Sequence, residues 1–285
     1  MKKKVIPMKS SLLVVAIMFL AAALQTQVVG GTVSPVQSSA RPFGLEIAGL
    51  VQLAGSDAQA ADFMQNSLPG LRASVEQNLS EKSPLPNVSN LALDPSALQL
   101  QYDANVRAYF IGEGAGYHNT LGFMTTPYSA SDGIGATDAK LIFPDASSPR
   151  SYLSSRANGG RTTNTPLLEG DFVDLGSFDA GTSINPFIVA NGANGGTNIF
   201  TAFDNENVDG LQHFVSLAVE GSPFLLIGVE DLLGGGDLDY NDVVFVLDVG
   251  EENVSYLVSQ TVPLPPAALA LAIPALALTF RRNRS

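Results

Sequence analysis

The sequence predicts an all-β fold, a β-sandwich or jelly-roll-like domain, over residues 100–259. After Tyr102, short apolar segments alternate with turns rich in Gly, Asn, Asp and Pro, a pattern typical of antiparallel sandwiches. Cysteine is absent, so no disulfide can stabilise the domain and a hydrophobic core has to do so. A segment of about 160 residues is an ordinary size for one such domain.

Each apolar segment in this region is expected to form one strand. The expected strands are Val106 to Ile111, Lys140 to Phe143, Phe172 to Leu175, Phe187 to Ala190, Ile199 to Phe203, Gln212 to Val219, Phe224 to Val229, Val243 to Val249 and Val254 to Ser259. The run from Val243 to Val249 is mostly apolar and rich in valine, which predicts a buried strand.

Residues 30–99 precede this domain and are rich in Ala, Gln, Ser and Leu. A Ser-Asp start signal predicts a helix from Asp57 to Asn66, which Pro69 and Gly70 should stop. A second helix is expected from Leu71 to Ser80. This partly helical leader is interpreted as a spacer or as a cap on the following domain, and disorder remains an alternative.

Residues 1–29 have the features of a secretory signal peptide. Four lysines precede an apolar run from Leu12 to Leu24, which matches a charged n-region and a short h-region. A membrane-anchoring helix is the alternative, but the run is shorter than the roughly 20 residues that a span requires.

Residues 260–285 carry a second apolar segment, from Ala267 to Phe280, followed by an arginine cluster. With the preceding Val-Pro-Leu-Pro, this tail resembles a PEP-CTERM sorting signal, although Leu264 stands where that family usually has Glu. The resemblance implies processing by an exosortase-type enzyme at the bacterial envelope. A simple C-terminal transmembrane anchor with arginines on the inner side is the alternative.

The net charge of the chain is strongly acidic. Seven of the 15 basic residues lie in the two terminal segments, which leaves 8 basic and 27 acidic residues and a formal charge of −19 between them. Nucleic acid is therefore excluded as a partner, because binding phosphates requires a basic face. Divalent cations are the expected partners of such a surface.

The segment from Gly228 to Gly250 concentrates side chains suited to a hard cation. Calcium takes six to eight oxygen ligands, which Asp and Asn side chains and backbone carbonyls on a tight loop can supply. Gly234 to Gly236 should adopt positive φ and fold the upstream Glu-Asp pair toward the Asp cluster. The predicted Ca²⁺ ligands are Glu230, Asp237, Asp239, Asn241 and Asp242.

Two other interpretations of this loop are an EF-hand and a solvated turn. An EF-hand needs Gly at its sixth position, where this chain has Asp242, and it needs flanking helices. A strand after Asp242 would carry Asp248 roughly 20 Å away, so Asp248 is excluded from the site. The remaining alternative is a solvated acidic turn in which Asp and Asn cap their own backbone amides.

With its strands placed, the chain resembles the domain of unknown function 4114 family. The resemblance covers Val106 to Asp248 and is carried by VRAYFIGEGAGYHNTLGF, GLQHF and FLLIGVEDLLGGGDLDYNDVVF. It implies a β-rich extracellular bacterial module with a calcium site in the last motif. Tyr240 occupies an aromatic position of that motif and is expected to anchor the core.

Four further features are of interest. The GEGAG segment from Gly112 to Gly116 predicts a glycine-rich turn, and Glu113 is a further metal ligand if this turn lies beside the acidic loop.

The segment from Asp204 to Gly210 predicts a solvated turn, because it lacks the bidentate Glu of a calcium loop. His118 and His213 are expected in turns or on strand surfaces.

These features together predict an exported, calcium-binding, non-enzymatic protein of the cell surface or extracellular matrix. The alternative is a calcium-dependent module that binds a glycan such as an exopolysaccharide, with Tyr117 and Tyr128 as the stacking residues. A secreted hydrolase is a third hypothesis, although no catalytic constellation is recognisable. Other surface proteins are further expected partners.

Overall fold

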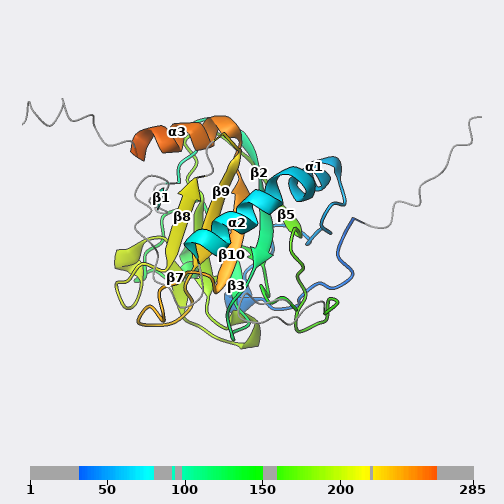
Figure 1. Cartoon of the computed structure of the whole chain (residues 1–285). Coiled ribbons are helices and arrows are strands. Elements are labelled where there is room, and N and C mark those ends of the chain that lie inside the picture. The colour runs from blue at the N-terminus through cyan, green and yellow to red at the C-terminus, as the bar shows by residue number, and fades with distance from the viewer. Residues whose placement is uncertain (1–31, 80–91, 94–97, 150–158, 219–220, 262–285) are drawn as a thin grey trace, which may run out of the picture. The chain divides into compact units, whose positions relative to one another are not determined.

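The computed structural model describes residues 32–79, 92–93, 98–149, 159–218 and 221–261 (Figure 1). The chain divides into two units, Met1–Gly30 and Gly31–Ser285, and only the second contains described residues. The expected signal peptide and the apolar C-terminal tail both lie outside the described residues. Within the described part, no helix combines the length and apolar character needed to cross a bilayer.

The fold is mainly β, as predicted, and consists of two antiparallel sheets. The larger sheet has the strand order β1-β8-β9-β10-β2-β5, and the smaller has the order β4-β3-β6-β7. The strands are β1 (Ala92–Leu93), β2 (Ala104–Gly112), β3 (Thr120–Met124), β4 (Lys140–Phe143), β5 (Phe172–Phe178), β6 (Asn185–Val189), β7 (Ile199–Thr201), β8 (Phe214–Ala218), β9 (Phe224–Val229) and β10 (Val243–Asp248).

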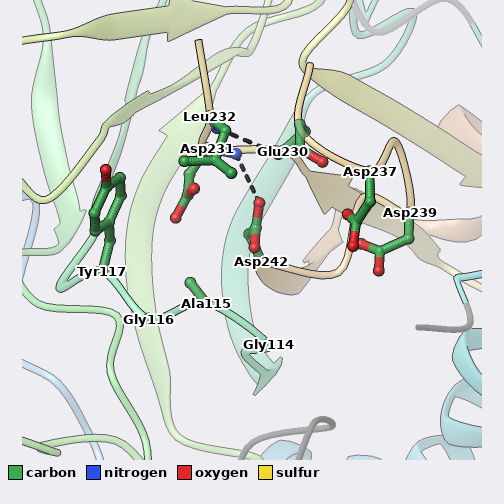
Figure 2. A pocket seen from close by; sticks show the side chains of 10 residues that line it. All are labelled: Gly114, Ala115, Gly116, Tyr117, Glu230, Asp231, Leu232, Asp237, Asp239 and Asp242. Carbon is green, nitrogen blue, oxygen red and sulfur yellow. Dashed lines mark hydrogen bonds between the residues drawn. The ribbon is translucent and has the colours of Figure 1, made fainter. Parts of the chain in front are cut away.

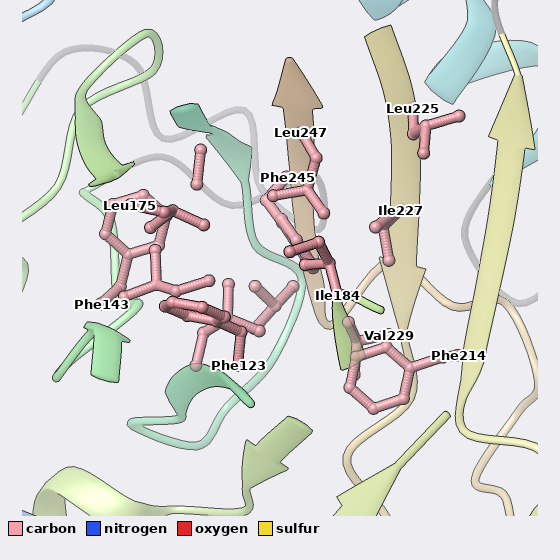
Figure 3. Packing of buried hydrophobic residues seen from close by; sticks show 14 of the residues in the cluster. Phe123, Phe143, Leu175, Ile184, Phe214, Leu225, Ile227, Val229, Phe245 and Leu247 are labelled. Carbon is pink, nitrogen blue, oxygen red and sulfur yellow. The ribbon is translucent and has the colours of Figure 1, made fainter. Parts of the chain in front are cut away.

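The main core lies between the two sheets. Figure 3 shows Phe214, Ile227 and Phe245 of the larger sheet on one side of this core and Phe123 and Phe143 of the smaller sheet on the other. Buried aromatic side chains of this size dominate the energy of a core, since each removes a large apolar area from water.

A second core covers the outer face of the larger sheet. Helices α1 (Ala58–Asp62) and α2 (Leu68–Asn78), joined by a π-helical turn over Phe63–Ser67, lie across this face (Figure 1). The Phe63 ring stacks on Tyr109 with centroids 3.8 Å apart. The leader therefore caps the sheet, which is one of the roles that the sequence left open.

Burial on both faces explains why the central strands are continuously apolar. Along β10, Phe245 points into the main core while its neighbours Val244 and Val246 belong to the second core. Successive side chains of a strand point to opposite faces, so both sets have to be apolar. The predicted buried strand at Val243 to Val249 is confirmed.

Two predictions about secondary structure were wrong, and two strands were missed. Residues Val254 to Ser259 form part of helix α3 (Glu251–Thr261) instead of a strand. Val254 and Leu257 are buried in the main core, a spacing that places both on one helical face. Pro69 lies in the first turn of α2, where no amide hydrogen bond is lost, and does not stop the helix. Strands β1 and β3 were not predicted.

Candidate metal centre

The acidic loop joins β9 to β10 and lies at one end of the larger sheet. Strand β2 pairs with β10 in antiparallel register, and Val244 is opposite Gly112. The turn that follows Gly112 therefore comes to lie beside the acidic loop, as the Gly114 amide shows by donating to the Asn241 carbonyl over 2.8 Å. Figure 2 shows this turn facing the loop across a cavity.

The loop has an unusual backbone. Gly234, Gly235 and Gly236 have φ values of 87°, 81° and 46°, as the sequence predicted. Leu238 and Tyr240 also adopt positive φ, at 61° and 55°. Such conformations cost about 1–3 kcal/mol each for residues other than glycine, so the loop adopts them only because its surroundings enforce them.

Glycine at position 236 also leaves room for the Glu230 carboxylate in its present position. A Cβ atom there would clash with Oε1 of Glu230. This close approach brings the Glu230 carboxylate to the Asp cluster, which is the arrangement that the sequence predicted for the glycine run.

The loop gathers its carboxylates into two groups of possible metal ligands. Oxygens of Glu230, Asp237 and Asp239 lie within 4.8 Å of one another, and those of Glu230, Asp231 and Asp242 do the same. Two oxygens bound to one Ca²⁺ at about 2.5 Å can be at most about 5 Å apart, so both groups have suitable dimensions. Four of the five predicted ligands are brought together, and Asp231 joins them.

Several of these carboxylates are removed from water. Glu230 is 1 % exposed, Asp231 3 % and Asp239 2 %, whereas Asp237 is exposed. Burial raises the pKa of Glu230, and the neighbouring Asp242 carboxylate raises it further. Burial likewise raises the pKa values of Asp231 and Asp242. Within the described ranges, Glu230, Asp231 and Asp242 form no ion pair with a basic residue.

Hydrogen bonds position part of the cluster. The Asp231 amide donates to Oδ2 of Asp242 over 2.8 Å, and the Leu232 amide donates to Oε1 of Glu230 over 3.2 Å (Figure 2). Asn119 donates to Oδ2 of Asp231 through its side-chain amide. Oε2 of Glu230 is buried and receives no hydrogen bond.

Asn241 lies in the loop, but its side chain forms a hydrogen bond with a residue outside the loop. Its side-chain amide donates to the Leu79 carbonyl over 3.2 Å, at the end of α2, and the residue is 1 % exposed. Its neighbour Tyr240 is buried in the second core, which confirms the expected anchoring role. Asn241 and Tyr240 therefore attach the loop to helices α1 and α2, which cover the larger sheet.

His213 contacts the backbone of the acidic loop and the carboxylate of Asp209. Its Nδ1 lies 2.8 Å from the Glu230 carbonyl and its Nε2 lies 3.1 Å from Oδ2 of Asp209. Asp209 also accepts from the Gly234 amide over 2.8 Å. The prediction that His213 lies in a turn or on a strand surface is wrong, because the residue is completely buried and stacks on Phe200.

The second acidic segment, Asp204 to Gly210, also contacts the acidic loop, through Asp209, and is therefore more than a solvated turn. Asn207, which is 5 % exposed, donates to the carbonyls of Thr201 and Leu211. The segment contributes no carboxylate to the two groups of metal ligands.

Glu113 lies in the turn beside the loop, where the sequence allowed for a further ligand. It is 7 % exposed, and burial, with the nearby Asp145 and Asp231 carboxylates, raises its pKa to about 8. Ser148 donates to its Oε1 through the backbone amide over 3.4 Å. Glu113 is a member of neither group of metal ligands.

A cavity of about 550 Å³ opens over the centre. It is lined by the turn from Gly114 to Tyr117, by Leu232 and by the carboxylates of Asp231 and Asp242 among others. Tyr117 is 43 % exposed, and Figure 2 shows its ring beside this cavity. His118, the next residue, places Nδ1 3.2 Å from Oδ2 of Asp145.

The fold and the centre together define a β-sandwich module with a carboxylate-rich loop at one end of its larger sheet. Residues 178–250 match the family model described as "Domain of unknown function (DUF4114)". The matched segment includes β6 to β10 and the whole acidic loop, so it supports the resemblance for the GLQHF segment and the last motif, while the first motif lies before it. Comparison with curated proteins found no significant match, and neither did comparison with solved structures.

Proposed function

We propose that the protein is an exported, calcium-binding, non-enzymatic component of a bacterial cell surface or extracellular matrix. One observation carries the proposal: the buried Glu230 and Asp231 are brought together with the half-buried Asp242, without a basic partner among the described residues. At 4.8 Å, two ionised carboxylates repel each other by about 3.5 kcal/mol at an effective dielectric constant of about 20. A bound divalent cation would convert this repulsion into attraction.

The chemistry of the donors favours calcium. Carboxylate and carbonyl oxygens are hard ligands, and a loop that supplies many of them suits the six to eight ligands of Ca²⁺. Magnesium usually binds through one or two carboxylates and keeps several waters, so it has less use for such a cluster. A zinc site with thiolates is excluded, because the chain has no cysteine.

The two terminal segments support the proposed location. A signal peptide over residues 1–29 would direct export, and a PEP-CTERM-like tail over 260–285 would direct sorting by an exosortase-type enzyme. Extracellular calcium is abundant enough to fill a site of modest affinity, such as those of extracellular modules at about 10⁻⁴–10⁻³ M.

Calcium titration by calorimetry of the full chain tests the proposal. Wild-type protein should bind calcium, and Asp231→Asn with Asp239→Asn, which together remove a carboxylate from each group, should weaken binding at least tenfold. Asp132→Asn, which removes an exposed carboxylate outside the loop, is the matched control and should leave binding unchanged. Absence of calcium binding in the wild type would overturn the proposal.

A calcium-dependent glycan-binding module is the second candidate function. The observation that favours it is the position of Tyr117, whose exposed ring lines the same cavity as Asp231 and Asp242. A sugar could stack on this ring while its hydroxyl groups bind the calcium ion. Tyr128, the other predicted stacking residue, lies elsewhere, beside the small core that contains Met124 and Phe187.

A glycan array probed in saturating calcium tests this second function. Tyr117→Ala should abolish any binding, whereas Tyr102→Ala, which removes a comparably exposed ring two residues before β2, should preserve it. Absence of wild-type binding to any glycan, or binding that persists in chelator, would contradict it.

A further inference from the structure

We propose that the acidic loop binds two calcium ions and that Glu230 is the carboxylate that bridges them. This inference rests on the proposed function and specifies the number and arrangement of its ions. The first ion would be held by Glu230, Asp237 and Asp239, and the second by Glu230, Asp231 and Asp242.

The geometry divides the five carboxylates into two sets. Among the residues that the structure describes, Glu230 alone belongs to both groups. In Figure 2, Asp231 and Asp242 lie on the side of Glu230 that faces Tyr117, and Asp237 and Asp239 lie on the other side. One ion can bind only oxygens that lie within about 5 Å of one another, so each group is suited to an ion of its own.

Glu230 itself provides an independent indication. The residue is 1 % exposed, and its Oε2 receives no hydrogen bond from any described residue. A buried carboxylate oxygen without a donor is unfavourable, and a bound cation would satisfy it. Its Oε1 already accepts from the Leu232 amide, so the free oxygen is available to a metal while the other is held in place.

The charge of the cluster also favours two ions. The five carboxylates carry five negative charges when ionised, of which one calcium ion offsets two and two ions offset four. With a single ion, at least two carboxylates would remain as an uncompensated pair next to the site. That pair would be Asp231 with Asp242 or Asp237 with Asp239, and burial makes either costly, because Asp231 and Asp239 are almost completely removed from water.

Hydrogen bonds orient two carboxylates of the second group, those of Asp231 and Asp242. Asn119 orients the Asp231 carboxylate, and the Asp231 amide orients that of Asp242. Asp237, in contrast, is exposed on the glycine-rich part of the loop. We expect two affinities that differ measurably, with the better-oriented second group binding more tightly.

The stoichiometry of calcium binding to the full chain tests the inference. Equilibrium dialysis followed by elemental analysis should give two calcium ions per wild-type chain. Asp231→Asn and Asp239→Asn should each reduce the value to one, because each removes a ligand of one ion only. Glu230→Gln should weaken both ions at least tenfold, and Asp132→Asn should still bind two.

The outcomes separate this inference from the proposed function. A wild-type stoichiometry of one would overturn the bridged pair and leave a calcium-binding protein. A stoichiometry of zero would overturn the proposed function as well. The wild-type measurement needs no variant, so the inference stays testable even where a substitution prevents folding.

Discussion

At Gly236 the backbone passes against the Glu230 carboxylate, and this contact sets the geometry of the centre. A Cβ atom at this position would clash with Oε1 of Glu230. At Gly234 a Cβ atom would meet nothing within 4 Å, although φ is positive at both residues. Alanine at either position would have a positive φ, but only at position 236 would it clash with Glu230. Comparing the two substitutions therefore separates the cost of the backbone conformation from the cost of the clash.

We predict that Gly236→Ala lowers both stability and calcium affinity. Alanine with positive φ costs about 1–2 kcal/mol, and a clash in a packed site adds about 1–3 kcal/mol. Gly234→Ala should incur only the backbone cost and keep wild-type affinity. Urea unfolding in chelator measures the stability, and calcium titration measures the affinity. Equal affinities for the two variants would show that position 236 does not shape the centre.

The residues of the centre were predictable only in part. Asp237, Asp239 and Asp242 were identified because hard-cation ligands were closely spaced beside a glycine run. Asp231 was missed as a ligand because its contribution depends on how the β9–β10 connection folds back. His213 was missed because it lies 17 residues before Glu230 and reaches its carbonyl only through the pairing of β8 with β9.

At the scale of elements, the turn after β2 is held against the loop by close backbone approach. A Cβ atom on Gly114 would clash with Oδ1 of Asn241, whereas one on Gly116 would meet nothing within 4 Å. Neither glycine has a positive φ, so alanine at either position causes no backbone strain. Only alanine at position 114 would introduce a clash.

Gly114→Ala should therefore destabilise the protein by about 1–3 kcal/mol, because it overpacks a tight contact. Gly116→Ala should leave the stability within about 0.5 kcal/mol of the wild type, as expected of an exposed position. Thermal unfolding of both variants in chelator gives the comparison. A destabilisation of the same size in both would mean that the turn does not depend on its contact with Asn241.

Helix α3 is held on the sandwich by Asn253. The side chain accepts from the amides of Gln101 and Tyr102 over 2.8 and 2.9 Å and donates to the carbonyls of Tyr102 and Val249. Asn253→Ala would leave buried backbone groups without partners, which costs about 1–3 kcal/mol for each such group.

We predict that Asn253→Ala lowers the free energy of unfolding by about 2–4 kcal/mol. Ser255→Ala, on the exposed face of the same helix, should change it by less than about 0.5 kcal/mol. Urea denaturation monitored by circular dichroism measures both. A loss below 1 kcal/mol for Asn253→Ala would show that its four hydrogen bonds do not determine how α3 is attached.

Strands buried on both faces were predictable, whereas elements defined by tertiary contacts were not. Strands β9 and β10 were identified because both faces had to be apolar, which leaves a clear run in the sequence. The valines and aromatic residue of α3 suggested a strand, but the packing of Val254 and Leu257 on the main core favours a helix. Strand β3 contains Gly122, which weakens the local strand signal.

For the whole molecule, the buried carboxylates make stability depend on pH in a way that calcium should reverse. The pKa of Glu113 is raised to about 8, and those of Glu230, Asp231 and Asp242 are also raised. An acid with a raised pKa in the folded state binds protons more tightly there than in the unfolded chain. Its stabilising contribution is present below the unfolded pKa and is lost as pH rises through the folded pKa.

In chelator, the melting temperature should fall on the order of 5 °C between pH 5 and pH 8, over and above any change caused by the net charge. In excess calcium, this decline should be small or reversed, because the cation favours the ionised form and competes with protons. Melts at several pH values in both buffers measure this. An identical pH dependence in the two buffers would mean that calcium does not bind these carboxylates.

The most direct test of a calcium-stabilised module compares the unfolding of the full chain in calcium and in chelator at pH 7.5. Ligand that binds only the folded state stabilises it by RT ln(1 + [L]/Kd), which is about 2.7 kcal/mol at a hundredfold excess over Kd. We predict a gain of at least this size for the wild type, retained in Asp132→Asn and reduced in Asp231→Asn with Asp239→Asn, which affects both groups of ligands. Identical stability of the wild type in calcium and in chelator would contradict the account.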